Sequence, residues 1–301
     1  MIYRKKVFNM KQTNLGKYIA FSFLFILGIF WIIPIIWLIL NSFKYDADFI
    51  TSFASIKGSL DYLSRLIPRE WTASNYTELL FGGNNVNTNA HILLMFQNSF
   101  IVSSTVTVFT IFITSLSAFA YERLEFKHGE KIFWTLLYLS MFPNVVSILP
   151  QFRIANALGW VNNLNALIWP SLAGVFYIFM IRNFMKGIPK ALDEAATIDG
   201  ASSFQVYSKI ILPSIAPVMI VVGLFAFNTS WNDYLWPRIV MTDVNNQTLT
   251  AGLRLLMGQY EQRWAHLIAS CLTSMIPPFL LYLFAQKYFL KGISIQASVK
   301  G

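Results

Sequence analysis

The chain has 301 residues, of which 55% are hydrophobic and 12% are charged, and its mean hydropathy is +0.53. Soluble domains carry about 25% charged residues, so this composition excludes an ordinary soluble enzyme, a disordered chain and a collagen-like fibre. The single cysteine, Cys271, excludes an internal disulfide framework and a cysteine-based zinc site. The class that remains is an all-α integral membrane protein with several spans.

Six apolar segments are long enough to cross the roughly 30 Å hydrocarbon core of a bilayer as helices. None of them contains Asp, Glu, Lys or Arg, and a charge at the bilayer centre costs about 2.5–3.5 kcal/mol or more. A secretory signal is a weaker interpretation of the first segment, because its apolar run is long and no small-residue cleavage site follows. The predicted spans are Tyr18–Leu40, Ser99–Tyr121, Ile132–Phe152, Leu164–Ile181, Leu212–Asn232 and His266–Gln286.

Lys and Arg concentrate on one predicted side of the membrane. That side holds the N-terminal segment, the loops after spans two and four, and the C-terminal tail. The positive-inside rule makes it cytoplasmic, so both termini are expected in the cytoplasm. Topology and anionic lipid headgroups therefore explain the net charge of +9 better than nucleic-acid binding does. The predicted parts are an N-terminal segment 1–17, a six-span domain 18–290 and a tail 291–301.

The longest predicted loop, Asn41–Asn98, follows the first span and is expected to hold short helices near Leu60–Leu66 and Asn75–Leu80. Span two then carries a stripe of hydroxyl side chains whose spacings of three and four place them on one helical face. Small hydroxylated residues allow membrane helices to pack closely, so packing and the lining of a path both stay open. The stripe consists of Ser103, Thr107, Thr110, Thr114 and Ser117.

Spans three and five carry the candidate lining of a translocation path. The polar face of span three lies between Pro143 and Pro150, which can kink or break the helix and free carbonyl groups that need partners. Span five ends in amides, hydroxyls and an indole, for which an interfacial aromatic belt is the alternative interpretation. The candidate path residues are Asn144, Ser147, Gln151, Asn228, Trp231 and Asn232.

The loop between spans four and five, residues 186–212, is predicted to form two short helices separated by a break. Pro189 suits a first helical turn, Gly200 can adopt the left-handed conformation that ends a helix, and Ser202 with Gln205 has capping-box spacing. Acidic and small side chains on the first helix suit close approach to a basic partner surface. A solvated amphipathic connector is the alternative. The candidate contact residues are Asp193, Glu194, Ala195, Ala196, Asp199 and Gly200.

This loop resembles the signature of permease subunits of binding-protein-dependent ABC importers, because Glu194-Ala195-Ala196, Gly200, Ile210 and Leu212-Pro213 fit its spacing without a gap. Further motifs narrow the resemblance to sugar importers of the maltose-type (MalG-like) family. These motifs are Trp71-Thr72, Asn75-Tyr76, Pro143, Pro150, Leu158-Gly159, Ile188-Pro189, Asp199-Gly200-Ala201, Trp231-Asn232, Thr248-Leu249 and Val299-Lys300-Gly301.

The resemblance implies the type I importer permease fold in a bacterial plasma (inner) membrane. Loop 186–212 would be a coupling helix seated in a groove of a cytoplasmic ATPase, with Glu194 facing a basic group and Gly200 making the turn. Val299, Lys300 and Gly301 would reach between two ATPase subunits. A second, homologous permease would complete an alternating-access path. An extracytoplasmic binding protein would deliver a carbohydrate, and the outer segment Pro237–Arg263, with Arg254, Gln259 and Tyr260, would face that protein.

The energy source is expected on another chain, because the sequence has no Gly-x-x-x-x-Gly-Lys-Ser/Thr phosphate loop. ATP and Mg²⁺ would bind to the partner ATPase, and no cofactor, metal or catalytic residue is expected here. The predicted spans lack the charged relays of ion-coupled transporters, which makes an ion-coupled secondary sugar transporter the weaker alternative. The predicted function is that of a transmembrane subunit of an ATP-driven carbohydrate importer.

Overall fold

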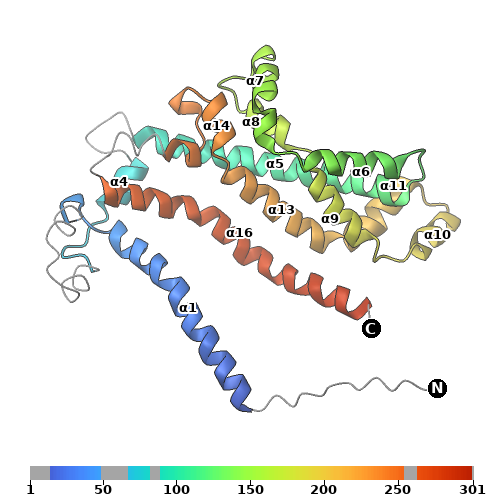
Figure 1. Cartoon of the computed structure of the whole chain (residues 1–301), viewed down its shortest axis with the longest axis horizontal. Helices are drawn as coiled ribbons and strands as arrows, with labels where there is room; N and C mark the ends of the chain where they lie inside the picture. The colour runs from blue at the N-terminus through green and yellow to red at the C-terminus, as the bar shows by residue number, and fades with distance from the viewer. Residues whose placement is uncertain (1–13, 49–66, 82–88, 254–262, 300–301) are drawn as a thin grey trace. The chain divides into compact units, whose positions relative to one another are not determined.

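The computed structural model describes residues 14–48, 67–81, 89–253 and 263–299 (Figure 1). Helices dominate these residues and no β-strand occurs among them, which confirms the predicted all-α class. The chain divides into two compact units, Met1–Asn75 with Gln262–Leu272, and Tyr76–Glu261 with Thr273–Gly301. Each unit is described by itself.

The first unit contains α1 (Asn14–Ser42), the beginning of α4 (Ser74–Phe81) and the first turns of α16 (Trp264–Val299). The large apolar side chains along α1 are exposed, as expected for a helix that faces lipid. At the C-terminal end of α1, the Asn75 side-chain amide donates hydrogen bonds to the carbonyl oxygens of Ser42 and Lys44, both at 2.9 Å. The predicted helix near Asn75–Leu80 is confirmed, and Leu60–Leu66 lies outside the described residues.

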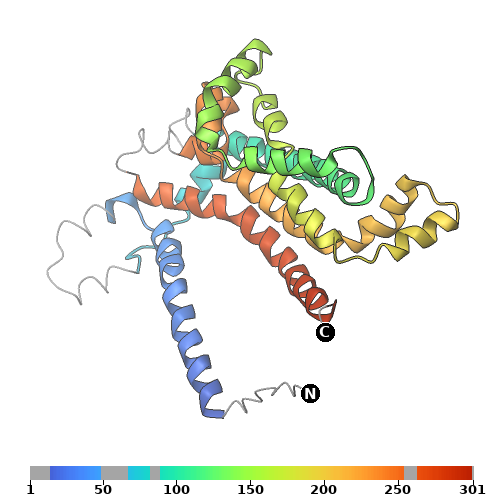
Figure 2. The same ribbon diagram turned by 45° about the vertical axis from the view of Figure 1, so that its right-hand side comes forward.

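The second unit is built around α5 (Asn89–Arg123), which packs along α9 (Val175–Met185) and α13 (Ala216–Trp231) (Figures 1 and 2). Gly223 of α13 permits this close approach, because a Cβ atom there would lie 2.8 Å from Cδ1 of Ile111 on α5. This unit also contains the rest of α4 and of α16, helical residues at 249–253, and further helices. These are α6 (Gly129–Ser140), η1 (Asn144–Ser147), α7 (Ile148–Ala157), α8 (Asn165–Ile168), η2 (Trp169–Ser171), α10 (Ala191–Ile198), α11 (Ser203–Val206), η3 (Tyr207–Ile211), α12 (Leu212–Ser214), α14 (Leu235–Val240) and η4 (Val244–Asn246).

The hydroxyl stripe of α5 serves helix packing. Ser103, Thr110 and Thr114 are fully buried. The Thr114 hydroxyl donates to the carbonyl oxygen of Thr110 at 2.6 Å, and the hydroxyl groups of Ser103 and Ser230 lie 3.3 Å apart between α5 and α13. Of the two interpretations left open for this stripe, the burial favours packing.

Four described helices are long and apolar enough to cross a membrane, and they are Gly16–Ser42, Ile92–Arg123, Asn165–Met185 and Trp264–Tyr288. Two bent helix pairs raise the number of spans to as many as six. The predicted third span is bent by 91° between Gly129–Ser140 and Asn144–Ala157. Pro143 occupies this break, where it has no N–H to continue the helix and disfavours helical geometry in the residue before it.

The predicted fifth span, which starts at Leu212, contains a helix break just after that start. The helix that starts at Ser203 continues through Pro213 to Ser214, and a bend of 77° separates it from the segment Ala216–Val240. Residues Tyr207–Ile211 form a wide π-helical turn. Pro213 accounts for this turn, since it lacks the N–H that would bond one turn back and its ring crowds the carbonyl there.

Candidate functional site

Residues 186–212, predicted to couple to an ATPase and called the coupling segment below, fold as two short helices with the predicted break between them. Gly200 has φ +84°, and the N–H groups of Gly200 and Ala201 donate to the carbonyl oxygens of Thr197 and Ala196 at 3.0 and 2.9 Å. This is the Schellman pattern that ends a helix with a left-handed residue. Ser202 and Gln205 form the predicted capping box at the start of α11. Pro189 lies just before α10 rather than in its first turn.

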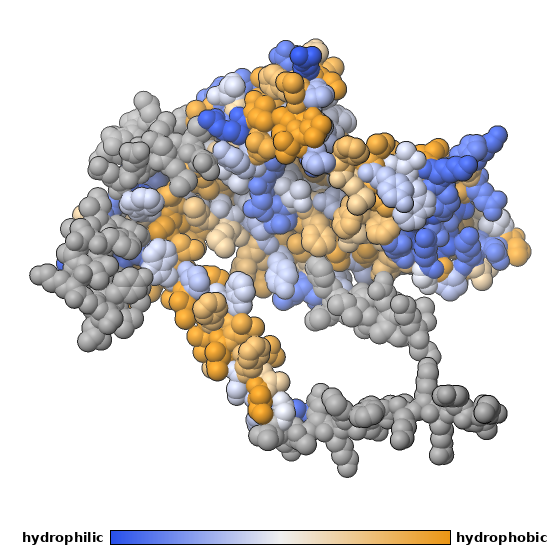
Figure 3. All heavy atoms as spheres, in the orientation of Figure 1, coloured by the Kyte–Doolittle hydropathy of each residue, from blue (hydrophilic) through white to orange (hydrophobic). Residues whose placement is uncertain are grey.

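Hydrophilic side chains gather at the end of the second unit that α10 and α11 form (Figure 3). Glu194, Ala195 and Asp199 are exposed there, whereas Ala196 is half-buried against the core. Ile198 is 86% exposed and shares a shallow groove with Glu194. An apolar side chain exposed among polar ones marks a protein contact surface when it belongs to a patch. Ile198 was not predicted, although its position four residues after Glu194 on one helical face was a usable signal.

Asp193 borders the same groove as Glu194 but is less exposed, because its side chain also turns toward α5. Its carboxylate lies 2.9 Å from Nε of Arg123 at the end of α5, and the two side chains are 18% and 5% exposed. The Arg123 guanidinium also donates to the carbonyl oxygens of Ile188 and Met185 at 2.8 and 3.3 Å. Asp193 thus forms an ion pair within the chain, and its predicted contact with a partner stays a prediction. Arg123 was not among the predicted residues.

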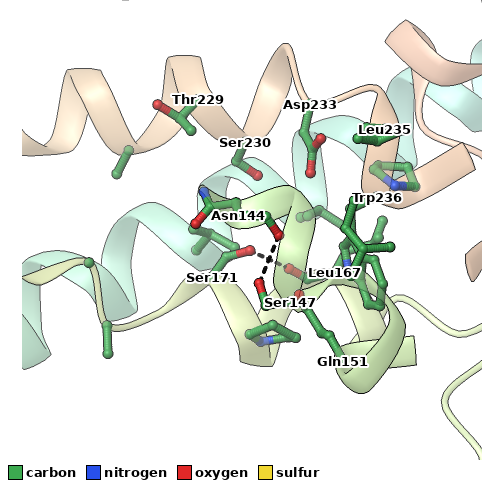
Figure 4. A pocket seen from close by; sticks show the side chains of 18 of the residues that line it. Asn144, Ser147, Gln151, Leu167, Ser171, Thr229, Ser230, Asp233, Leu235 and Trp236 are labelled. Carbon is green, nitrogen blue, oxygen red and sulfur yellow. Dashed lines mark hydrogen bonds between the residues drawn. The ribbon is translucent and has the colours of Figure 1, made fainter. Parts of the chain in front are cut away.

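A second feature is an open cavity of about 730 Å³ that is lined mainly by α5, η1, α7, α9, α13 and α14 (Figure 4). Asn144, Ser147 and Gln151 line it together, as their shared helical face predicted. The Ser147 hydroxyl donates to the Asn144 carbonyl oxygen at 2.8 Å, so the two amide side chains are the hydrogen-bond donors that this face offers to a ligand, and the Ser147 oxygen can still accept. Other polar residues of the lining are Ser140, Ser171, Tyr177, Thr229, Ser230, Asp233 and Thr248.

The predicted path residues of span five do not line this cavity. Trp231 is buried, and its indole N–H donates to the Ser274 carbonyl oxygen at 3.0 Å. Asn232 donates instead to the Asn228 side chain at 2.9 Å. The cavity receives Thr229, Ser230 and Asp233 from this end of α13. Thr229 and Ser230 lie on one face of α13, and Asp233 follows directly after the end of this helix. The prediction chose the most polar residues and overlooked the 3.6-residue repeat that separates this face from Asn228 and Trp231.

Asp233 is the one charged side chain among the described residues that line the cavity. In Figure 4 its carboxylate points toward the face that carries Asn144 and Ser147. Backbone N–H groups at the start of α14 face this carboxylate. The indole N–H of Trp236 donates to the Ala166 carbonyl oxygen at 2.8 Å, which fixes one apolar wall.

Residues 90–295 match the family described as binding-protein-dependent transport system inner membrane component. The chain belongs to this family. It is therefore a membrane-spanning permease component of a binding-protein-dependent transport system, as the motifs of the coupling segment predicted.

Several family members are similar along most of the chain. The trehalose/maltose transport system permease protein MalG of Thermococcus litoralis is 31% identical over 96% of this chain and 99% of its own length. The arabinooligosaccharides transport system permease protein AraQ of Bacillus subtilis is 28% identical over 93% of this chain and 94% of its own. The sn-glycerol-3-phosphate transport system permease protein UgpE of Salmonella typhi is 33% identical over 76% of this chain and 82% of its own length.

The fold is also that of a solved importer. A crystal structure of a bacterial ABC transporter involved in the import of the acidic polysaccharide alginate matches with a TM-score of 0.73 at 20% identity. The match covers 92% of this chain and 98% of that one. This likeness confirms the predicted importer permease fold.

Two groups of predicted contacts lie at the edge of the described residues or beyond them. The side chain of Val299 and the residues Lys300 and Gly301 are outside the described part, although α16 extends to Val299. Arg254, Gln259 and Tyr260 also lie outside it. The roles of these residues stay predictions.

Proposed function

We propose that this chain forms half of an alternating-access path for a neutral carbohydrate and that separate ATPase subunits drive it through the coupling segment. A second permease completes the path, and an extracytoplasmic binding protein delivers the sugar. The chain binds no ATP itself. The coupling segment and both termini face the cytoplasm.

The observation that carries the proposal is the exposed helix–turn–helix of the coupling segment. It presents Glu194, Ala195 and Ile198 beyond the helical bundle, and Gly200 and the capping box of Ser202 hold its turn. A solvated connector does not require an exposed isoleucine and alanine beside an acid. Their position at a hydrophilic end of the unit supports docking onto a partner with an apolar groove and a basic group.

The cavity supports a neutral sugar as the transported substrate. Asn144, Gln151, Thr229 and Ser230 offer amide and hydroxyl groups to sugar hydroxyls. Asp233 is the one charge among the described lining residues, and it is negative. None of the described lining residues is a Lys or Arg that could pair with an anionic substrate, so the lining favours a neutral one.

Uptake by the complete assembly in proteoliposomes tests the function. The binding protein is placed on one side and ATP on the other, and radiolabelled trehalose, maltose, an arabino-oligosaccharide and sn-glycerol 3-phosphate are offered in turn. We expect uptake of a neutral sugar that requires both ATP and the binding protein. Uptake driven by a proton or sodium gradient without ATP would contradict ATP coupling, and a preference for glycerol phosphate would contradict the neutral substrate.

Replacing both Asn144 and Gln151 with alanine is expected to lower sugar uptake at subsaturating substrate about ten-fold. Each lost hydrogen bond is worth about 0.5–1.5 kcal/mol, and a ten-fold change corresponds to about 1.4 kcal/mol. The matched control replaces Asn228 and Asn232, two amides outside the cavity lining, and should leave uptake near that of the unaltered chain. An equal loss of uptake in both double variants would contradict the assignment of Asn144 and Gln151 to the translocation path.

A further inference from the structure

The last two residues of α5, Glu122 and Arg123, carry opposite charges, and each pairs with an oppositely charged residue of another helix. Glu122 accepts a hydrogen bond from Nε of Arg182 on α9 at 2.9 Å. Arg123 pairs with Asp193 on α10, also at 2.9 Å. The C-terminal end of α5 therefore forms ion pairs with both α9 and α10 through two adjacent side chains.

Arg182 extends the first pair to a third helix. Its side chain is 4% exposed, and its guanidinium also bonds to both carboxylate oxygens of Glu130 on α6. The guanidinium lies over the Phe133 ring, 4.5 Å from the ring centre. Because a buried guanidinium is costly to leave without its partners, this network holds α5, α6 and α9 together.

Arg123 holds α10 in a similar way. Within the described residues, Asp193 is the α10 residue whose side chain forms an ion pair or hydrogen bond with a residue outside the coupling segment. The same guanidinium also bonds to the backbone of Ile188, just before α10. The helix that carries Glu194 on its outer face is thus fastened to α5 by its inner face.

We propose that Arg123 is a positioning residue that locks α10 to α5, so that both helices move as one rigid piece when the ATPases close. The Glu122–Arg182–Glu130 network passes the same movement to α9 and α6. Val106 of α5 lines the cavity, about 25 Å from Arg123 at 1.5 Å per residue. A rigid connection over that length would let a shift at the coupling segment reshape the cavity. This inference rests on the proposed function of the coupling segment.

The first test measures sugar transported per ATP hydrolysed by the reconstituted assembly. We expect Asp193→Asn to lower this ratio about ten-fold while the assembly still forms and hydrolyses ATP, because α10 can then move without α5. Asp193→Glu, which keeps the charge, should restore the ratio. The control Glu125→Gln removes an exposed acid between α5 and α6 and should not change it. An unaltered ratio in Asp193→Asn would overturn the proposal.

A cross-link provides a second test that does not depend on the strength of an ion pair. Arg123→Cys and Asp193→Cys are combined with Cys271→Ser, and a short bifunctional thiol reagent joins the two positions. We expect the cross-linked assembly to transport more sugar per ATP than the same variant without the reagent. A cross-link that stops transport would show that α10 must leave α5, which overturns the proposal. Failure of the proposed function would look different, since the unaltered chain would then show no ATP-driven transport.

Discussion

Glu194→Lys is expected to reduce ATP-dependent uptake at least about 100-fold while the chain still reaches the membrane. Glu194 is exposed on the outer face of α10, where the proposed ATPase docks, and its side chain has no role in the core. A reversed charge at a docking surface places like charges together, which costs several kcal/mol. The measurement compares sugar uptake with the amount of chain in the membrane fraction, and co-purification of the ATPase reports docking.

Glu125→Lys is the matched control for this change. Glu125 is also an exposed acid, it lies between α5 and α6, and the change in net charge is the same. Uptake near that of the unaltered chain is expected. Normal uptake by Glu194→Lys would remove the docking assignment, and an equal loss in both variants would point to net charge instead of position.

Gly200→Val is expected to lower uptake about ten-fold or more per folded chain. Gly200 has φ +84°, where an L-residue costs roughly 1–2 kcal/mol and a β-branched residue is a clear outlier. A Cβ atom there would have no neighbour within 4 Å, so backbone strain and not a clash is the cause. Relief of the strain would open the turn that orients α10. Gly200→Asn, which tolerates this conformation better, should retain more uptake than valine does.

Gly159→Val is the control that distinguishes a loss of coupling at Gly200 from the general effect of backbone strain on the protein. Gly159 has φ +67°, and a Cβ atom there would also meet no neighbour within 4 Å, so valine has the same conformational cost outside the coupling segment. Transport per folded chain should stay near that of the unaltered protein, with thermal unfolding in detergent reporting the strain of both variants. If both variants lose transport equally, the turn at Gly200 has no special part in coupling.

The features that the sequence predicted depend on short-range physics. The apolar segments show their membrane role through composition alone, because burial in lipid needs only length and the absence of charge. The turn at Gly200 and the capping box at Ser202 use hydrogen bonds between residues at most five positions apart. Asn144, Ser147 and Gln151 share a face through helical spacing, and the structure confirms that they come together.

The sequence by itself thus determined the membrane class, the family and the shape of the coupling segment. The tertiary structure alone decided that Asp193 turns inward to Arg123 and that Thr229, Ser230 and Asp233 replace the predicted amides in the cavity. It also set the angles of the two helix bends, 91° and 77°, of which the prolines of span three had predicted only that a bend could occur. Each of these depends on the rotation of one helix against another or on where a proline-containing helix resumes. Such orientations follow from the packing of segments that are distant in the chain, so the local sequence pattern of one helix does not predict them.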